Sequence, residues 1–414
     1  MLYWTPVNWK LDSGDLETGK LILKMKYNFD EYVDRRGTDC SKLDDLNELF
    51  GSDNLIPLWV ADMDFKSPPE ITKALMKRVE HGLFGYTVES TRYRDSIVNW
   101  LDRRHGWKIK REDLNFVPGV VKGFAFAIDE FTEVGDNIII QPPVYHPFRI
   151  VSESLKRNVV NNPLVLENGQ YRMDIEGLRK IVAEKSCSML ILCNPHNPAG
   201  RAWTKEELSE LAEICFDNNI LVVSDEIHSD MALPGFKHTP FATVSAKAEN
   251  NCVTLMAPSK TFNIAGIVSS FAVITDKKIR DRYRSFMTPR GLDQGTLFAY
   301  TATCTAYEEC DEWLDEMLNY VQANIEFVDV YLKENIPQIK AIIPESSFLI
   351  WLDCRELNLN QSELVKLFVD KAGLALNDGS IFGQEGVGFM RLNVGTPRKV
   401  IERALVNLNK AVND

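Results

Sequence analysis

The chain has 414 residues, which exceeds the length that a single hydrophobic core normally supports, so two or three domains are predicted. Its 59 acidic residues outnumber its 47 basic ones, and the net charge of −12 argues against a nucleic acid or an anionic membrane as the main partner. No apolar run approaches the roughly 18 residues that cross a bilayer, so no membrane partner is expected.

The cysteines, the histidines and the first residues limit the possible compartment of the protein and its need for a metal. The eight cysteines form no CxxC pair and several stand in apolar runs, which predicts buried, reduced thiols in a cytoplasmic protein. Six scattered histidines give no metal signature, so no metal is predicted. Residues 1–24 lack the apolar core of a signal peptide and are interpreted as an irregular leader; the folded unit could begin at Met25.

The first third of the chain begins with the apolar run 55–65, which reads as a short strand entering a polar turn. Apolar residues at helical spacing predict a helix over 69–81, a loop follows at 82–87, and a second helix is expected over 95–104. From residue 115, short apolar runs alternate with helices such as 120–131, which predicts an α/β domain with a mainly parallel sheet. The expected strands include 137–140, 189–193, 220–224, 252–256 and 268–274.

The last third predicts a second, α+β domain. A continuous helical region over 300–334 is followed by strands at 348–352 and 390–394 and by helices at 361–372 and 399–412. The predicted division is a leader over 1–24, a small α+β domain made of 25–75 and 306–414, and a large domain over 76–305.

Lys260 follows the strand-like run 252–256 and stands among small, hydroxyl and apolar residues; the next charged residue is Asp276. Burial disfavours an ammonium ion and lowers its pKa from about 10.4, and a neutral amine is the nucleophile that condenses with an aldehyde. The alternative is a lysine whose ammonium group reaches solvent at the end of a strand, and this segment alone leaves both interpretations open.

Polar side chains also follow three other predicted strands: Tyr145, Asn197 and Asp225. Ligands of open α/β sheets bind beyond the carboxyl ends of the strands. An aromatic ring, an amide, a carboxylate and the amine of Lys260 are therefore expected to share one site. Each residue alone also has a structural interpretation, such as an Asn-Pro turn for Asn197 or a core tyrosine for Tyr145.

From about Tyr27 onwards the chain resembles the fold-type I pyridoxal-phosphate enzymes of the aminotransferase class I/II superfamily. Within them it is most similar to the MalY/PatB-type group of cystathionine β-lyases and C–S lyases. The resemblance implies a large domain with a mainly parallel seven-stranded sheet between helices, a smaller α+β domain, and pyridoxal 5′-phosphate as cofactor. It rests on NPHNPAGR, SDEIHSD, APSKTFNIAG and RLNVGTPR, and for the group on LWVADMDF, HGLFGYT and PPVYHPF.

The resemblance assigns roles to the strand-end residues. Lys260 would join the cofactor aldehyde as a Schiff base and then move the proton at the substrate Cα. Asp225 would pair with the pyridine nitrogen and keep the ring electron-accepting. Asn197 would donate to the ring hydroxyl and Tyr145 would stack on the ring. His228, which stands where aspartate aminotransferases have a tyrosine, is also counted among the cofactor contacts.

The cofactor phosphate and the substrate need further partners. For the phosphate, the resemblance implies three kinds of contact. These are the backbone amides of Val120 and Val121 at a helix start, the Ser259 hydroxyl, and Tyr86 from the other subunit of a dimer. Arg391 is implied for the substrate carboxylate, which its guanidinium can bind in bidentate fashion; a structural salt bridge is the alternative. Where many relatives have an arginine for the phosphate, this chain has Val268.

The implied activity is a β-elimination that converts L-cystathionine or another cysteine S-conjugate into a thiol, pyruvate and ammonia. Two alternatives stay open: an aminotransferase using the same site, and a regulator that keeps the fold and binds a transcription factor. The expected partners are a small amino-acid substrate and a second copy of the chain in a homodimer with a shared active site.

Overall fold

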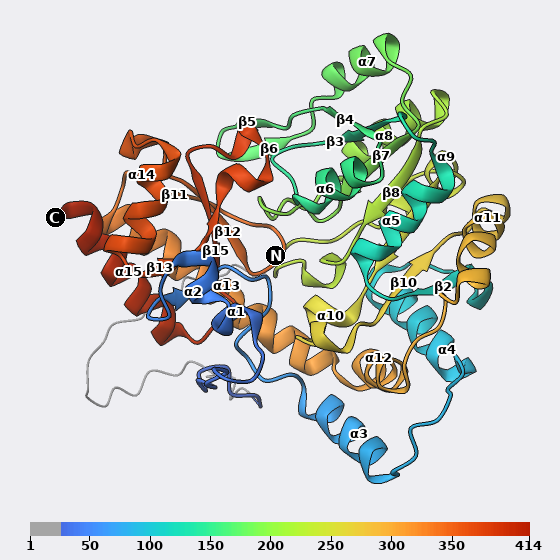
Figure 1. Cartoon of the computed structure of the whole chain (residues 1–414), viewed down its shortest axis with the longest axis horizontal. Coiled ribbons are helices and arrows are strands. Elements are labelled where there is room, and N and C mark those ends of the chain that lie inside the picture. Colours follow the sequence, from blue (N-terminus) through green and yellow to red (C-terminus); the bar gives the residue numbers. More distant parts are fainter. Residues whose placement is uncertain (1–25) are drawn as a thin grey trace, which may run out of the picture.

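The computed structural model describes residues 26–414, so the expectations for the leader and for a start at Met25 lie outside the described residues. Figure 1 shows a large sheet with helices packed around it, beside a second group of strands and helices from the C-terminal quarter of the chain. Within residues 26–414, no helix has both the length and the apolar composition needed to cross a membrane.

The large sheet confirms the predicted seven strands in a mainly parallel arrangement. Five neighbouring strands run parallel, and only β10 runs antiparallel to both of its neighbours. In spatial order the strands are β2 (Leu114–Val117), β10 (Ser270–Val273), β9 (Cys252–Met256), β8 (Leu221–Asp225), β7 (Met189–Cys193), β3 (Asn137–Ile140) and β4 (Asn158–Asn161).

Helices cover this sheet because its central strands are apolar on both faces: every residue of β7, β8 and β9 is buried. The helix α5 (Val120–Phe131) packs on β8, β9 and β10. The other helices of this part are α4 (Thr91–Trp100), α6 (Pro147–Ser154), α7 (Ile175–Glu184), α8 (Lys205–Asp217), α9 (Ala246–Glu249), α10 (Pro258–Thr261), α11 (Lys277–Met287) and α12 (Leu297–Glu309), with a short hairpin of β5 (Val165–Glu167) and β6 (Gln170–Arg172).

A smaller sheet lies beside the large one. It consists of the antiparallel strands β11 (Lys340–Ile342), β12 (Leu349–Asp353), β15 (Phe389–Asn393) and β14 (Asn377–Asp378), accompanied by α13 (Asp311–Asn335), α14 (Gln361–Lys366) and α15 (Arg398–Asn413). The segment that holds β1 (Ile56–Pro57) joins this part, because β1 pairs in parallel with β13 (Leu374–Ala375). The segment before β1 contains the helices α1 (Ser41–Asp44) and α2 (Leu46–Phe50), and the helix α3 (Pro69–Glu80) after it packs against α12.

Three predicted elements differ from the structure. The run 55–65 holds only the two-residue strand β1, because side chains rather than a neighbouring strand take the carbonyls that follow it. The helix predicted over 300–334 is two helices, α12 and α13, which meet at the buried Cys310. The helix predicted from 95 begins at Thr91, because the Ser90 hydroxyl caps it by accepting from the backbone amide of Tyr93.

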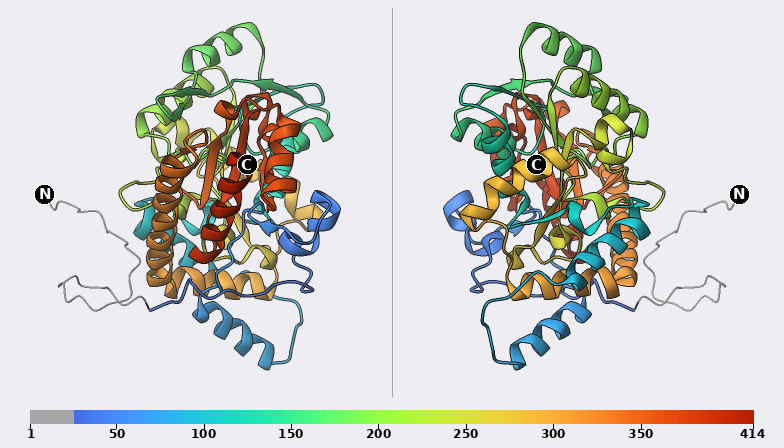
Figure 2. Two further views of the ribbon diagram at one scale, coloured as in Figure 1. Left: turned by 90° about the vertical axis from the view of Figure 1, so that its left-hand side faces the viewer. Right: turned by 90° about the vertical axis from the view of Figure 1, so that its right-hand side faces the viewer.

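All eight cysteines lie in the described part of the chain, and all are buried and free, as predicted. Some apolar side chains, unlike the cysteines, are exposed. The helix α3 and the segment after it project from one end of the molecule in both views of Figure 2. That segment exposes four large apolar side chains: Leu83, Phe84, Tyr86 and Val88. The buried cysteines bear on the compartment of the protein, and the exposed apolar side chains bear on its oligomeric state.

Candidate active site

Lys260 lies in the short helix α10, directly beyond the carboxyl end of β9. Its Nζ donates a hydrogen bond of 2.6 Å to the backbone carbonyl of Ala61. Burial lowers the pKa of this amine to about 8, the carboxylate of Asp62 opposes that shift, Arg391 adds to it, and Asp225 opposes it. About a tenth of this amine is therefore neutral at pH 7, far more than for a lysine of ordinary pKa.

Asp225 is the last residue of β8, the strand that pairs with β9 in the sheet. The side chain is buried, and among the described residues its only hydrogen bond comes from the backbone amide of Ile227, at 3.1 Å. Burial raises its pKa to about 7, while the Lys260 amine counteracts that rise. Because this carboxylate accepts only one hydrogen bond from the described residues, it is free to accept another from the protonated nitrogen of a ligand ring.

Arg391 lies on β15, where its guanidinium is buried. Nη1 donates to Asn197 Oδ1 at 3.0 Å, and Nη2 donates to the carbonyl of Trp59 at 2.8 Å and to Asn377 Oδ1. No carboxylate of residues 26–414 forms a salt bridge with it, and Nε has no hydrogen-bond partner there. Burial lowers its pKa to about 10. The salt-bridge alternative therefore fails, and the guanidinium is suited to a carboxylate supplied by a ligand.

Asn197 and Tyr145 lie beside these groups. The backbone amide of Tyr145 donates to the carbonyl of Asn197 at 3.1 Å, which ties the two loops together. Burial raises the pKa of Tyr145 to about 12; the Asp225 carboxylate adds to this rise and Arg391 opposes it. The amide, the ring and the carboxylate, which follow three strands of the large sheet, thus lie in one region with the guanidinium of Arg391, which comes from the small sheet.

His228 also belongs to this region. Its side chain is buried and Nδ1 has no partner in the described part of the chain. Burial, the Lys260 amine and Arg391 lower its pKa to about 3, so the imidazole is neutral. It can therefore give or accept a hydrogen bond without adding charge to the site.

The predicted phosphate partners divide into two groups. Val120 and Val121 begin α5 after Gly119, whose φ of 111° favours glycine, and the free amides of this helix start can receive an anion. Ser259 is buried in α10 next to Lys260. Tyr86, by contrast, is fully exposed.

The sequence did not single out four residues that contact the site: Trp59, Ala61, Asp62 and Asn377. Three of them belong to the LWVADMDF run, which places two aspartates in apolar surroundings. The cost of burying an unpaired charge, which drew attention to Arg391, applies equally to these aspartates and could have identified Asp62.

Comparisons with known proteins identify the family of this chain. The family model described as Aminotransferase class I and II matches residues 53–408, and the chain belongs to this family. It is 42% identical over 385 residues to cystathionine beta-lyase PatB of Bacillus subtilis, covering 93% of this chain and 100% of that one. Two solved structures are similar over 94% of this chain: cystalysin from Treponema denticola, which contains pyridoxal 5′-phosphate (34% identity, TM-score 0.91, 100% of that chain), and the PLP-bound C–S lyase from Staphylococcus hominis (30% identity, TM-score 0.89, 99% of that chain).

These similarities confirm the predicted fold-type I architecture, and the residues present fit the cofactor that the fold implies. The site offers an amine of lowered pKa on Lys260 for an aldehyde and a buried carboxylate on Asp225 for a ring nitrogen. It also offers a helix start at α5 for a phosphate. The ends of β8 and β9 are therefore the candidate cofactor site.

The raised pKa of Asp225 predicts an effect on stability in the cofactor-free protein. Between pH 4 and 7 its carboxyl is ionised in the unfolded chain but protonated in the folded one, so its unfavourable contribution grows as the pH rises to about 7. Asp225→Asn should therefore raise the free energy of unfolding at pH 8 by about 2–4 kcal/mol, and by progressively less towards pH 4. Urea unfolding measures this. Asp217→Asn, at an exposed carboxylate, is the control; a gain that does not depend on pH would contradict the prediction.

Proposed function

We propose that this chain is a pyridoxal-phosphate-dependent C–S β-lyase that converts L-cystathionine or another cysteine S-conjugate into a thiol, pyruvate and ammonia. The proposal depends on one observation: the Lys260 amine, the Asp225 carboxylate and the Arg391 guanidinium converge on one buried site. The names of PatB and of the Staphylococcus hominis lyase support the β-elimination of a thiol.

Each of these residues has a defined task. Arg391 binds the substrate α-carboxylate, and its contacts with Asn197 and Trp59 fix the plane of the guanidinium. The amine of Lys260 accepts the Cα proton, for which a pKa of about 8 is well matched to neutral pH. Asp225 holds the ring nitrogen, and the bound cofactor supplies an electron sink for the bond that breaks at Cα. The thiolate then leaves from Cβ and is protonated to the thiol, and the released aminoacrylate reacts with one water molecule to give pyruvate and ammonia.

An aminotransferase is the second candidate, because the family model carries that description. The two activities differ in products. Incubation of the cofactor-loaded protein with L-cystathionine, without an added keto acid, should release free thiol and pyruvate in equal amounts. An amino-group transfer that requires a keto acid and leaves the C–S bond intact would overturn the lyase proposal in favour of the aminotransferase.

The protein is proposed to be a cytoplasmic homodimer with a shared active site. The segment after α3 exposes Leu83, Phe84, Tyr86 and Val88 together, and monomers seldom leave such clusters in water. A partner chain would cover these side chains and bring Tyr86 to the cofactor phosphate of the neighbouring subunit. The eight buried, free cysteines fit a reducing compartment.

Subunit mixing tests the shared site. Tyr86→Ala should weaken cofactor binding and Lys260→Ala should be inactive, yet a hybrid dimer of the two variants regains one complete site. Coexpression in equal amounts should give about a quarter of wild-type activity, because half of the dimers are hybrids with one working site. Tagged hybrids isolated by affinity chromatography provide the measurement. If hybrids are no more active than either parent, Tyr86 does not act in the partner's site.

A further inference from the structure

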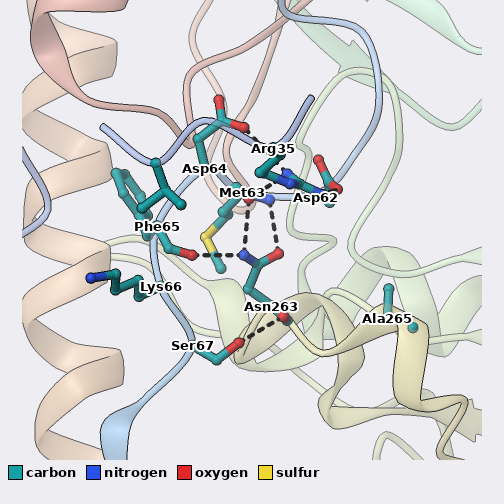
Figure 3. A pocket seen from close by; sticks show the side chains of 11 residues that line it. Arg35, Asp62, Met63, Asp64, Phe65, Lys66, Ser67, Asn263 and Ala265 are labelled. Atoms are coloured by element: carbon teal, nitrogen blue, oxygen red, sulfur yellow. Dashed lines mark hydrogen bonds and ion pairs between the residues drawn. The ribbon is translucent and has the colours of Figure 1, made fainter. Parts of the chain in front are cut away.

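Asn263 connects two segments that lie far apart in the sequence, as Figure 3 shows. Its Oδ1 accepts from the backbone amide of Met63 at 3.0 Å, and its Nδ2 donates to the carbonyls of Met63 and Phe65 at 2.9 and 2.8 Å. The Ser67 hydroxyl donates to the backbone carbonyl of Asn263 at 2.9 Å. Both polar atoms of the Asn263 side chain therefore bind the backbone of the segment 58–65.

The backbone of Asn263 has a conformation that few residues adopt. Its φ of 55° lies in the left-handed region, which asparagine tolerates better than most residues other than glycine. The amide of Ile264 donates to the carbonyl of Ser259 at 2.9 Å, so the chain from Ser259 to Ile264 forms one tight turn. Lys260 and Asn263 both belong to this turn, which fixes where their side chains begin relative to each other.

The Lys260 amine contacts the same distant segment. Its Nζ donates to the carbonyl of Ala61 at 2.6 Å, two residues before Met63. Covalent chain and hydrogen bonds therefore form a closed ring, which runs from Lys260 along the turn to Asn263 and crosses to Met63. The ring then returns along the backbone to Ala61 and crosses to the Lys260 amine. The distance between the amine and the Ala61 carbonyl is set within this ring.

Other contacts hold the segment 58–65 to different parts of the molecule. Asn393 Nδ2 donates to the carbonyl of Val60 at 2.6 Å, and the buried Lys42 amine lies 2.8 Å from Asp64 Oδ1. Asn393 belongs to β15 and Lys42 to α1. These contacts fix the segment to the small sheet and to α1, whereas Asn263 fixes it to the turn that carries Lys260.

We propose that Asn263 is a positioning residue, which closes this ring and so places the Ala61 carbonyl that orients the Lys260 amine towards the substrate Cα. The inference rests on the proposed function for the task of the amine, but the ring is present in the cofactor-free chain. An amine that donates one N–H to a fixed carbonyl has its lone pair directed away from that carbonyl. Such orientation matters because a base must lie within hydrogen-bond reach of the proton that it removes.

A double-mutant cycle in the cofactor-free full-length chain tests the ring. Asn263→Gly removes the amide group and keeps a residue that tolerates the left-handed backbone. It should lower the midpoint of urea unfolding in the wild-type background, and lower it less in Lys260→Ala, where the bond to Ala61 is already absent. Asn358→Gly is the matched control, because the exposed Asn358 has the same φ of 55°, and it should act equally in both backgrounds. Equal shifts for Asn263→Gly in both backgrounds would overturn the proposal.

Kinetics of the cofactor-loaded protein test the consequence for Lys260. Asn263→Gly should reduce kcat, expressed per bound cofactor, by about 10- to 100-fold, because the base is misplaced at the reacting atom. KM should stay within about threefold of wild type, since Arg391 keeps its contacts with Asn197 and Asn377. Substrate deuterated at Cα should give an isotope effect on kcat at least as large as in wild type, because proton transfer is the slowed step. An unchanged kcat, a change in KM alone or a smaller isotope effect would contradict the proposed role.

A second variant keeps the proposal testable if Asn263→Gly folds poorly. Ser67→Ala removes the hydroxyl that binds the Asn263 carbonyl and leaves the side-chain amide in place, so it should lower kcat in the same way but by less. If Asn263→Gly does not fold, a wild-type kcat in Ser67→Ala would overturn the proposal. A wild-type protein that releases no pyruvate would refute the proposed function, while the urea cycle would still decide whether the ring exists.

Discussion

Replacing Lys260 with alanine is expected to reduce kcat/KM for L-cystathionine by at least about 10⁴-fold, because the variant loses both the covalent attachment of the cofactor and the base at Cα. The amine is placed for this work by the end of β9 and by the carbonyl of Ala61, and its pKa of about 8 suits proton transfer at neutral pH. Initial rates of pyruvate release, with and without added cofactor, give the comparison.

Lys277→Ala serves as the control for this experiment, since Lys277 is an exposed lysine at the start of α11. That variant should match wild type. Normal product formation by Lys260→Ala, under conditions where both proteins are folded by circular dichroism, would show that another group performs the proton transfer.

The second large effect is expected at Asp225. Asp225→Asn keeps the shape of the side chain but removes the charge that would pair with the ring nitrogen, and kcat should fall by about 10²–10³-fold, as when one charge-stabilising partner is lost from a buried site. The cofactor should also dissociate more readily. Steady-state kinetics and fluorescence titration with pyridoxal 5′-phosphate measure the two effects.

The same substitution should stabilise the cofactor-free protein above pH 7, so activity and stability change in opposite directions. Asp217→Asn, on the exposed side of α8, should change neither. A variant at residue 225 that is destabilised and inactive would instead indicate a purely structural role for this carboxylate.

Much of the large domain could be predicted because its strands are short apolar runs between turn residues. The bounds of β3, β7, β9 and α5 agree with the sequence to the residue. The break between α12 and α13 could not be predicted, because Cys310 is neither a glycine nor a proline and continues the apolar pattern. The division into domains stays a prediction.

The candidate site was predicted in part for a similar reason. The carboxyl ends of parallel strands in one sheet lie at the same edge, so the sequence alone places Asp225 and Lys260 together. The contacts of residues 58–65 could not be found this way. Asn393, which binds the Val60 carbonyl, is 333 residues away, and every residue possesses such a carbonyl. Nor can a sequence show that Arg391 has no carboxylate partner in the described part of the chain.

Borohydride reduction of the cofactor-loaded protein, followed by peptide mapping, tests the central claim most directly, because it makes the bond between cofactor and protein permanent. The claim is that the Lys260 amine carries the cofactor aldehyde. The predicted result is a single pyridoxyl-modified peptide with the modification on Lys260, absent from Lys260→Ala. Modification of a different lysine, or none in a sample that releases pyruvate from L-cystathionine, would contradict the claim.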